Sequence, residues 1–209
     1  MKKETIVLAS NNKGKIKEIK DILPDYEIIS LKEAGIFSNP EETEDTFEGN
    51  ALLKALDAKK HTEHMVIADD SGLEVSCLKN MPGVYSKRFY SYVNYNNNKN
   101  YTDSSYIDKL NIRTLLKLMF RVDQVNRNAR FVSVIALIKK DGSHVLFRGE
   151  CKGTILNEPR GKRGFGYDPI FMPACYNLSF AELTDEQKNK VSHRANALTK
   201  LKEYLNDWF

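Results

Sequence analysis

The spacing of apolar positions divides the chain into short strands and amphipathic helices. Apolar runs at 5–9, 26–31, 65–68 and 131–138 have the length of buried strands. An Asp141-Gly142 turn joins the last run to 145–147, which predicts a hairpin. Helical spacing marks four further segments: Ile16, Ile19, Ile22 and Leu23; Phe47, Ala51, Ala55 and Ala58; Ile107, Leu110, Leu115, Leu118 and Val122; and Val191, Ala195, Leu198, Leu201, Leu205 and Trp208. Thr184 with Gln187 predicts a capping box for the last of these, a long helix.

The third apolar run ends at two adjacent carboxylates, Asp69 and Asp70. Ser71-Gly72 is a turn signal, and a second run of alternating apolar residues follows it. The pattern therefore predicts a hairpin in which both acids lie beside the turn. Neighbouring acids repel, and a chain tolerates them where a cation or a substrate uses their charge. The alternative interpretation is that the two acids only begin a turn.

A possible phosphate site follows the first strand. Residues 10–15 read as a loop that leads into a helix. The free N–H groups of a first helical turn bind anions, and the loop also supplies lysine. Capping explains Ser10 and the asparagines equally well, but it does not explain Lys15. The loop is not a Walker motif.

Five acids lie between residues 41 and 50 without one base. Asp45 with Glu48 resembles a capping box for the helix that follows, and the helix dipole favours acids at such an end. Five acids are more than this structural role requires. They are Glu41, Glu42, Glu44, Asp45 and Glu48.

A glycine-rich stretch spans residues 160–171. Its glycines let the backbone approach a ligand closely, and its basic residues supply positive charge. Phe165 and Tyr167 offer rings on which a base can stack, and Asp168 offers an acceptor. A turn with core aromatics is the alternative. His193 and Arg194 are expected on the second or third turn of the last helix, where such a pair is more often solvated surface than site.

The composition limits the classes of protein to which this chain can belong. The chain has 209 residues and a net charge of +4, with a slightly acidic first half and a basic second half. The basic half lacks the dense Lys/Arg runs of nucleic-acid arms, so a small anionic substrate fits as well. Three cysteines without a CxxC motif predict reduced thiols in a cytoplasmic protein, and no apolar run approaches a membrane span. One domain over residues 1–209 is expected.

Two further segments carry no site in this interpretation. His61 and His64 lack a ligand cluster, and a surface helix end is favoured over a zinc site. The Tyr/Asn-rich stretch 90–105 has the composition of a mobile loop or an insertion.

Taken together, the motifs resemble the Ham1-type inosine triphosphate pyrophosphatases, the dITP/XTP pyrophosphatases. They occur in the family's order along the chain: SNNKGK at 10–15, EETEDTFEGNALLKA at 41–55, ADDSGLEV at 68–75, PGVYSKRF at 82–89, GFGYDPIF at 164–171 and ELTDEQKNKVSHRANAL at 182–198. The resemblance implies an α/β protein with a long mixed central sheet flanked by helices, two lobes with an active-site cleft between them, and a homodimer. It implies Mg²⁺-dependent hydrolysis of ITP, dITP or XTP to the monophosphate and pyrophosphate.

The same resemblance assigns roles to residues. Asp70 or Asp69 would orient and deprotonate the water, and Glu41, Glu42 and Asp70 would hold Mg²⁺. The remaining site residues would bind substrate. Lys15, Lys188 and the loop amides of Ser10, Asn11, Asn12, Lys13 and Gly14 would hold the phosphates, Phe165 and Tyr167 would grip the base, and Asp168, His193 and Arg194 would read its edge. Ser71 and Gly166 complete the set of substrate-binding residues.

Two other classes of protein remain as alternatives. A single-stranded nucleic-acid binding module would stack bases on the aromatic residues, but the carboxylate cluster would repel its ligand. A non-catalytic nucleotide sensor would have the same pocket, and only an activity assay separates it from the enzyme. No stable nucleic-acid partner and no membrane partner are expected.

Overall fold

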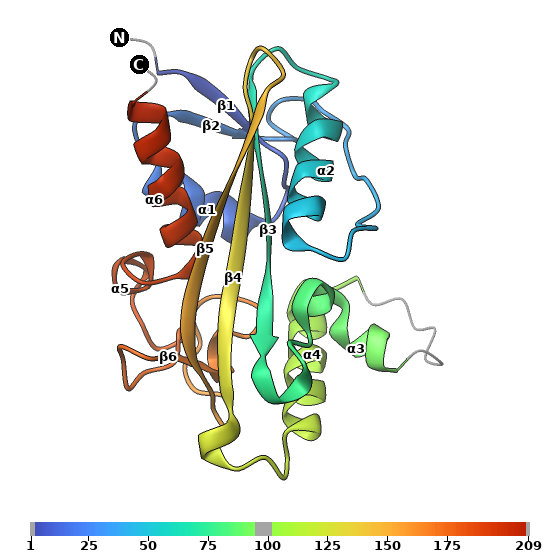
Figure 1. The fold of residues 1–209 in the computed structure, drawn as a ribbon, viewed down its shortest axis with the longest axis vertical. Coiled ribbons are helices and arrows are strands. Elements are labelled where there is room, and N and C mark those ends of the chain that lie inside the picture. The colour runs from blue at the N-terminus through green and yellow to red at the C-terminus, as the bar shows by residue number, and fades with distance from the viewer. Residues whose placement is uncertain (1–2, 95–101, 208–209) are drawn as a thin grey trace. The chain divides into compact units, whose positions relative to one another are not determined.

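The computed structural model describes residues 3–94 and 102–207. Its six strands form one mixed sheet in the order β2-β1-β3-β4-β5-β6 (Figure 1), in which β1 is parallel to β2 and β3 while β5 and β6 are antiparallel. The strands are β1 Thr5–Leu8, β2 Glu27–Ser30, β3 Met65–Val75, β4 Asn128–Ile138, β5 His144–Ile155 and β6 Phe171–Pro173. The helices are α1 Lys13–Ile22, α2 Phe47–Lys59, α3 Phe89–Val93, α4 Ser104–Leu118, α5 Asp185–Asn189 and α6 His193–Asn206. The expected α/β class with a mixed sheet is confirmed.

The chain divides into two compact units. Unit 1 comprises residues 1–71, 133–150 and 193–209, and unit 2 comprises 72–132 and 151–192. Strands β3, β4 and β5 therefore contribute residues to both units. The single domain and the cleft expected from the sequence stay predictions.

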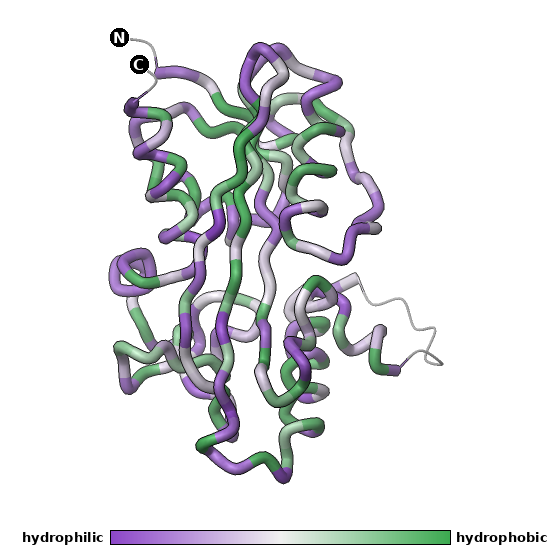
Figure 2. The backbone as a smooth tube through the Cα atoms, in the orientation of Figure 1, coloured by the Kyte–Doolittle hydropathy of each residue, from purple (hydrophilic) through white to green (hydrophobic). Residues whose placement is uncertain are grey.

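Unit 1 has its own apolar core. Its buried residues come from β1, β3, β4 and the helices α1 and α6, with α1 packed against α6 and β2 (Figure 1). Figure 2 shows the hydrophobic run along β4 that supplies part of this core. The expected stripe on α2 is confirmed, because Phe47, Ala51, Ala55 and Ala58 are all buried. The expected Asp45 cap is wrong: Thr46 caps α2 and accepts from the Gly49 amide.

Unit 2 has a second core, built from β3, β4, β5, the helix α4 and the segment 167–183. Helix α4 ends earlier than the apolar spacing indicates, since Leu118 is 43% exposed and Val122 lies beyond the helix. Residues 95–101 of the Tyr/Asn-rich stretch, and Trp208, lie outside the described residues. Among the described residues, no helix is both long enough and apolar enough to cross a membrane.

Two predicted element boundaries are wrong. β3 runs unbroken from Met65 to Val75, so Ser71-Gly72 is not a turn and the acids lie within a strand. The last helix is two helices, α5 and α6, which places His193 at the start of α6. The Thr184–Gln187 capping box is confirmed at α5. The hairpin at Asp141-Gly142 is also confirmed, with the Lys139 amide donating to Ser143 at 2.8 Å.

Arg127 ties the loop before β4 to the end of β5. It is 2% exposed, and its guanidinium donates to the carbonyls of Ile155, Met119 and Leu156 at 2.8–2.9 Å. We expect Arg127→Lys to lower the free energy of unfolding by about 1–3 kcal/mol, because a single ammonium cannot replace the planar fork of donors. Urea denaturation measures this. The exposed Arg121→Lys is the control, and an equal effect of both substitutions would contradict the role given to Arg127.

Candidate active site

Asp69 lies at the centre of a buried ion-pair network in unit 1. Its Oδ2 lies 2.7 Å from Lys15 Nζ and 3.1 Å from Arg194 Nη2, and Ser133 Oγ donates to its Oδ1 at 2.5 Å. Arg194 also forms an ion pair with Glu18. Burial alone would raise the pKa of Asp69, but attraction to Arg194 and Lys15 outweighs it and holds this pKa well below 3.8. Asp69 is therefore a permanent anion that fixes two cations, and it is a poor proton acceptor.

Asp70 has a different environment, because neighbouring side chains of a strand point to opposite faces. Its Oδ1 lies 2.5 Å from Lys54 Nζ, which also lies 3.2 Å from Glu42 Oε1 and 3.1 Å from the Asp69 carbonyl oxygen. Burial raises the pKa of Asp70 despite the attraction of Lys54 and Lys15. Of the two acids, Asp70 is the better suited to accept a proton from water.

Glu42 and Asp70 direct carboxylate oxygens at one point, where the Lys54 ammonium lies. Oxygen donors of this kind suit Mg²⁺, which binds one or two carboxylates and completes its shell with water and substrate phosphates. No cluster of three or more His, Cys, Asp or Glu that could hold a metal ion occurs within residues 3–94 and 102–207. Glu42 and Asp70 are therefore the carboxylates of this site that could serve as oxygen donors to Mg²⁺. No contact of Glu41 supports its expected role as a ligand.

The segment 10–15 differs from the expected open loop. Helix α1 begins at Lys13, and the Asn12 side chain accepts from the amides of Gly14 and Lys15 at 2.9 and 3.1 Å. Ser10 Oγ accepts from the Asn12 amide. Two amides of the first turn therefore already donate to a side chain of the protein. The positive charge of Lys15 is then the group of this segment that we expect to attract an anion. The side chains of Asn11 and Lys13 are exposed.

The start of α6 fixes Arg194. Gly149 of β5 permits the close approach, because a Cβ there would lie 2.2 Å from the His193 carbonyl oxygen and 2.3 Å from the Ala197 nitrogen. Arg194 is 1% exposed, and its Nη2 donates to Asp69 and to Ser71 Oγ. The alternative of a solvated pair on a helix surface is wrong, because Arg194 lies in the buried ion-pair network. Its role in reading the base stays a prediction. His193 is also buried.

Three residues of this network were missed from the sequence. Each had a weak signal: Glu18 lies one helical turn after Lys15, Lys54 is the first base after the acidic stretch, and Ser133 is a polar position inside an apolar strand. None of these signals identifies the side chain that the residue contacts in the folded protein. The network therefore follows from the fold, which brings α1, α2, β3, β4 and α6 together.

The glycine-rich turn in unit 2 holds a second charged cluster. Asp168 Oδ2 accepts from the Phe165 amide at 2.9 Å and lies 2.7 Å from Lys188 Nζ, whose ammonium lies 5.1 Å from the centroid of the Phe165 ring. Gly164 has φ +75°, and a Cβ there would lie 2.0 Å from Asp168 Oδ2, so only glycine fits. Asp108 of α4, also missed from the sequence, accepts from the Gly166 amide at 2.8 Å.

This cluster bears on two assignments. Tyr167 is 3% exposed, lies in the core of unit 2 and donates to the Ser86 carbonyl oxygen at 3.0 Å. Its ring is therefore packed against protein and not presented for stacking, which leaves Phe165 as the aromatic candidate. Lys188 is 6% exposed and paired with Asp168, and its role as a phosphate ligand stays a prediction.

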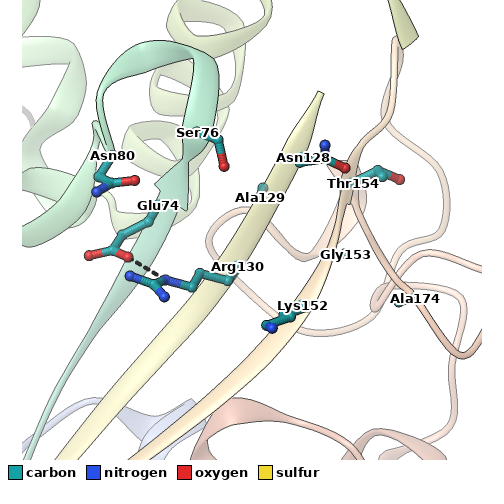
Figure 3. A pocket seen from close by; sticks show the side chains of 10 residues that line it. All are labelled: Glu74, Ser76, Asn80, Asn128, Ala129, Arg130, Lys152, Gly153, Thr154 and Ala174. Carbon is teal, nitrogen blue, oxygen red and sulfur yellow. Dashed lines mark hydrogen bonds and ion pairs between the residues drawn. The ribbon is translucent and has the colours of Figure 1, made fainter. Parts of the chain in front are cut away.

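A hollow of about 430 Å³ lies elsewhere in unit 2. Figure 3 shows polar side chains of β3, β4 and β5 around it, with the Glu74–Arg130 ion pair on one side. None of the site residues expected from the sequence lines it. They lie instead in the ion-pair network of unit 1, in the glycine-rich turn, or in the segments beside them.

Known proteins are similar to this chain over nearly its whole length. The dITP/XTP pyrophosphatase of Desulforamulus reducens is 44% identical over 203 residues, covering 96% of this chain and 95% of that protein. The dITP/XTP pyrophosphatase of Staphylococcus aureus is 43% identical over 200 residues, at 96% and 95% coverage. Among solved structures, the Ham1 protein of Staphylococcus aureus matches with a TM-score of 0.81 and 40% identity over 99% of this chain and all of that one. The HAM1 protein of Coxiella burnetii matches with a TM-score of 0.82 and 38% identity, at 98% and 99% coverage.

A sequence model of the Ham1 family matches residues 6–204. The match begins at the second residue of β1 and includes nearly all of α6. With relatives above 40% identity over almost the full length, the chain belongs to the Ham1 family.

Proposed function

We propose that this chain hydrolyses non-canonical purine nucleoside triphosphates, with ITP, dITP and XTP as the substrate class, to the monophosphate and pyrophosphate. The observation that carries the proposal is Asp70, a buried carboxylate of raised pKa beside the cations Lys54 and Lys15. The names of the relatives, dITP/XTP pyrophosphatases, support the substrate class.

Asp70 acts as the general base. A water that donates a hydrogen bond to Asp70 loses its proton to the carboxylate as its oxygen attacks the α-phosphorus, and pyrophosphate leaves. A base works best when its pKa is close to the working pH, and burial moves the pKa of Asp70 in that direction. Asp69 is the positioning residue: it holds Lys15 and Arg194 and takes no proton.

Lys15 and Lys54 bind the triphosphate. Their side chains are 17% and 15% exposed, and each ammonium is paired with a carboxylate in the absence of substrate. A phosphate oxygen bound to Lys54 would replace part of its contact with Glu42 and Asp70, which frees these carboxylates for a metal. Glu42 and Asp70 would hold Mg²⁺, which would supply neutralisation of the phosphate charge.

Other features remain predictions from the family resemblance. They are base contacts from residues 165–168, a homodimer, a cytoplasmic location and the lack of a stable nucleic-acid partner. Phe165 is the residue we assign to the base, because its amide and the face of its ring are both held in place.

The test is a pyrophosphate-release assay on ITP, dITP, XTP, GTP and ATP, with and without Mg²⁺. We expect turnover of the first three that greatly exceeds that of GTP and ATP and that is lost when Mg²⁺ is chelated. Tight binding of ITP without turnover would instead indicate a nucleotide sensor. Release of orthophosphate in place of pyrophosphate would overturn the proposed point of attack.

Lys15→Ala should weaken binding of the phosphate chain. Loss of one charge-assisted hydrogen bond of about 1.5–3 kcal/mol corresponds to a rise of roughly 10- to 100-fold in the KM for ITP and in the inhibition constant of pyrophosphate. Steady-state kinetics with product inhibition measures both constants. Lys20→Ala is the control, since Lys20 lies on the same helix and pairs with Glu33 at the surface. A change in base preference with unchanged pyrophosphate inhibition would contradict the placement of Lys15.

A further inference from the structure

Two of the three cysteines adjoin the same end of the β5–β6 pair. The register pairs Thr154 with Met172 and Gly153 with Pro173 in antiparallel order. Beyond this register, the Ala174 amide donates to the Lys152 carbonyl oxygen at 3.0 Å. Cys151 and Cys175 are the residues next to this hydrogen bond, one on each segment.

The end of the ladder brings both cysteines to one contact. β6 ends at Pro173, and the Tyr176 amide donates to the Pro173 carbonyl oxygen, which closes a turn that contains Cys175. Cys151 precedes Lys152 and Cys175 follows Ala174, so both cysteines adjoin the Ala174–Lys152 hydrogen bond. A disulfide needs a Cα separation of about 4.4–6.8 Å, which residues beside one cross-strand hydrogen bond can reach through movement of the turn.

The two thiols differ in access. Cys151 is 7% exposed and belongs to the core of unit 2, whereas Cys175 is exposed in the turn closed by the Tyr176 amide and the Pro173 carbonyl. Burial raises the pKa of Cys151 to about 12, and Cys175 adds to this rise, which is a second sign that the two sulfurs are neighbours. Cys175 is thus the thiol that an oxidant meets first, and Cys151 is the thiol that resolves it.

We propose that Cys151 and Cys175 form an oxidative modification site, in which a hydroperoxide converts the two thiols into an intramolecular disulfide. The Cys175 thiolate attacks the peroxide and becomes a sulfenic acid, releasing water or an alcohol. The Cys151 sulfur then attacks the sulfenic sulfur, and a second water leaves. Both thiols are oxidised by one electron each, and the peroxide takes up the two electrons.

The cross-link closes a loop that contains the glycine-rich turn with Phe165 and Asp168. Cross-linking a segment of this length restricts the unfolded chain, so the oxidised protein should be more resistant to heat by several degrees. This readout is independent of enzymatic activity. The modification also does not depend on the proposed function, since it uses no residue of the ion-pair network.

The experiment uses the full chain treated with hydrogen peroxide, alkylated after unfolding, digested and analysed by mass spectrometry. We expect a peptide pair joined through Cys151 and Cys175, an alkylated Cys77, reversal by dithiothreitol and a Tm higher than that of the reduced protein. Cys175→Ser should abolish the linked pair and the shift in Tm. Cys77→Ser, which removes the other exposed thiol, should preserve both.

Three results would overturn the proposal. Cys175 found as sulfinic or sulfonic acid, with Cys151 still alkylated, would show that the buried thiol does not resolve it. A linked dimer through Cys175 would show that a second chain reaches it first. Pairing of Cys77 with either cysteine would show that the register does not select the partner.

Discussion

Asp70→Asn is expected to lower the kcat for ITP by about 10²- to 10⁴-fold while the protein stays folded. The substitution keeps the size of the side chain. Lys54, which lies 2.5 Å from the Asp70 carboxylate, can still donate to the neutral amide oxygen of the asparagine. It removes the charge that accepts the proton of the attacking water, and it removes one of the two carboxylates assigned to Mg²⁺. Steady-state kinetics on ITP at saturating Mg²⁺, with circular dichroism to verify the fold, measures the effect.

Glu74→Gln is the matched control for Asp70→Asn. Glu74 lies on the same strand and is also a partly buried acid in an ion pair, at 2.6 Å from Arg130, but it has no place in the proposed chemistry. We expect its kcat to stay within about twofold of the wild type. If Asp70→Asn kept activity and Mg²⁺ dependence, the base would have to be another group. In that case Asp70 would be no more than a partner of Lys54.

Periodicity was a good guide to the elements but not to their ends. The alanine stripe of α2 and the hairpin after β4 were predictable because each depends on local spacing. The turn predicted at Ser71-Gly72 was wrong because a turn signal reflects only the conformational preference of the local sequence. Here Ser71 Oγ donates to Asp69 and accepts from Arg194, which is distant in the sequence, and β3 stays extended through this position.

The break between α5 and α6 was hidden for a related reason. Apolar spacing continues across it, yet the amides of Val191 and Ser192 both donate to the Lys188 carbonyl oxygen, which ends α5. Lys188 is bound to Asp168, while Arg194 is bound to Asp69 and Glu18. Ion pairs thus hold the chain on either side of the break, and none of the three acidic partners is near in sequence.

The roles of the two central acids could not be separated from the sequence. ADDSG places them side by side, and either could be the base. Their pKa values shift in opposite directions although both acids are buried. At Asp69 the attraction of Arg194 of α6 and Lys15 of α1 outweighs the effect of burial, whereas at Asp70 burial outweighs the attraction of Lys54 and Lys15. Only the fold determines which cation reaches which carboxylate.

Asp69→Asn should therefore have an effect on stability that Asp70→Asn does not have. With a neutral amide at position 69, Lys15 and Arg194 remain buried without the anion that they share, and breaking such a pair costs about 3–5 kcal/mol. We expect the free energy of unfolding at pH 7 to fall by about this amount. Asp70→Asn should stay within about 1 kcal/mol of the wild type, because burial of the ionised Asp70 is itself unfavourable.

The pH dependence separates the two acids further. The pKa of Asp69 is lower in the folded protein than in the unfolded chain, so its contribution to stability is complete above an unfolded pKa of about 3.9 and is lost as the pH falls through the folded value. The gap between wild type and Asp69→Asn should thus be constant from pH 7 to 5 and narrow only below about pH 4. The pKa of Asp70 is raised, so the protonated form of Asp70 stabilises the fold at low pH and this contribution is lost as the pH rises through the folded value.

Urea unfolding at several pH values between 7 and 3 measures both trends on wild type and the two variants. If the free energies of unfolding of wild type and Asp69→Asn differ by less than 1 kcal/mol at pH 7, Glu18 and Ser133 would be sufficient to stabilise the buried Lys15 and Arg194 without Asp69. A gap that widens towards low pH would mean that Asp69 is the carboxyl with the raised pKa. Asp69 would then be the better candidate for the base.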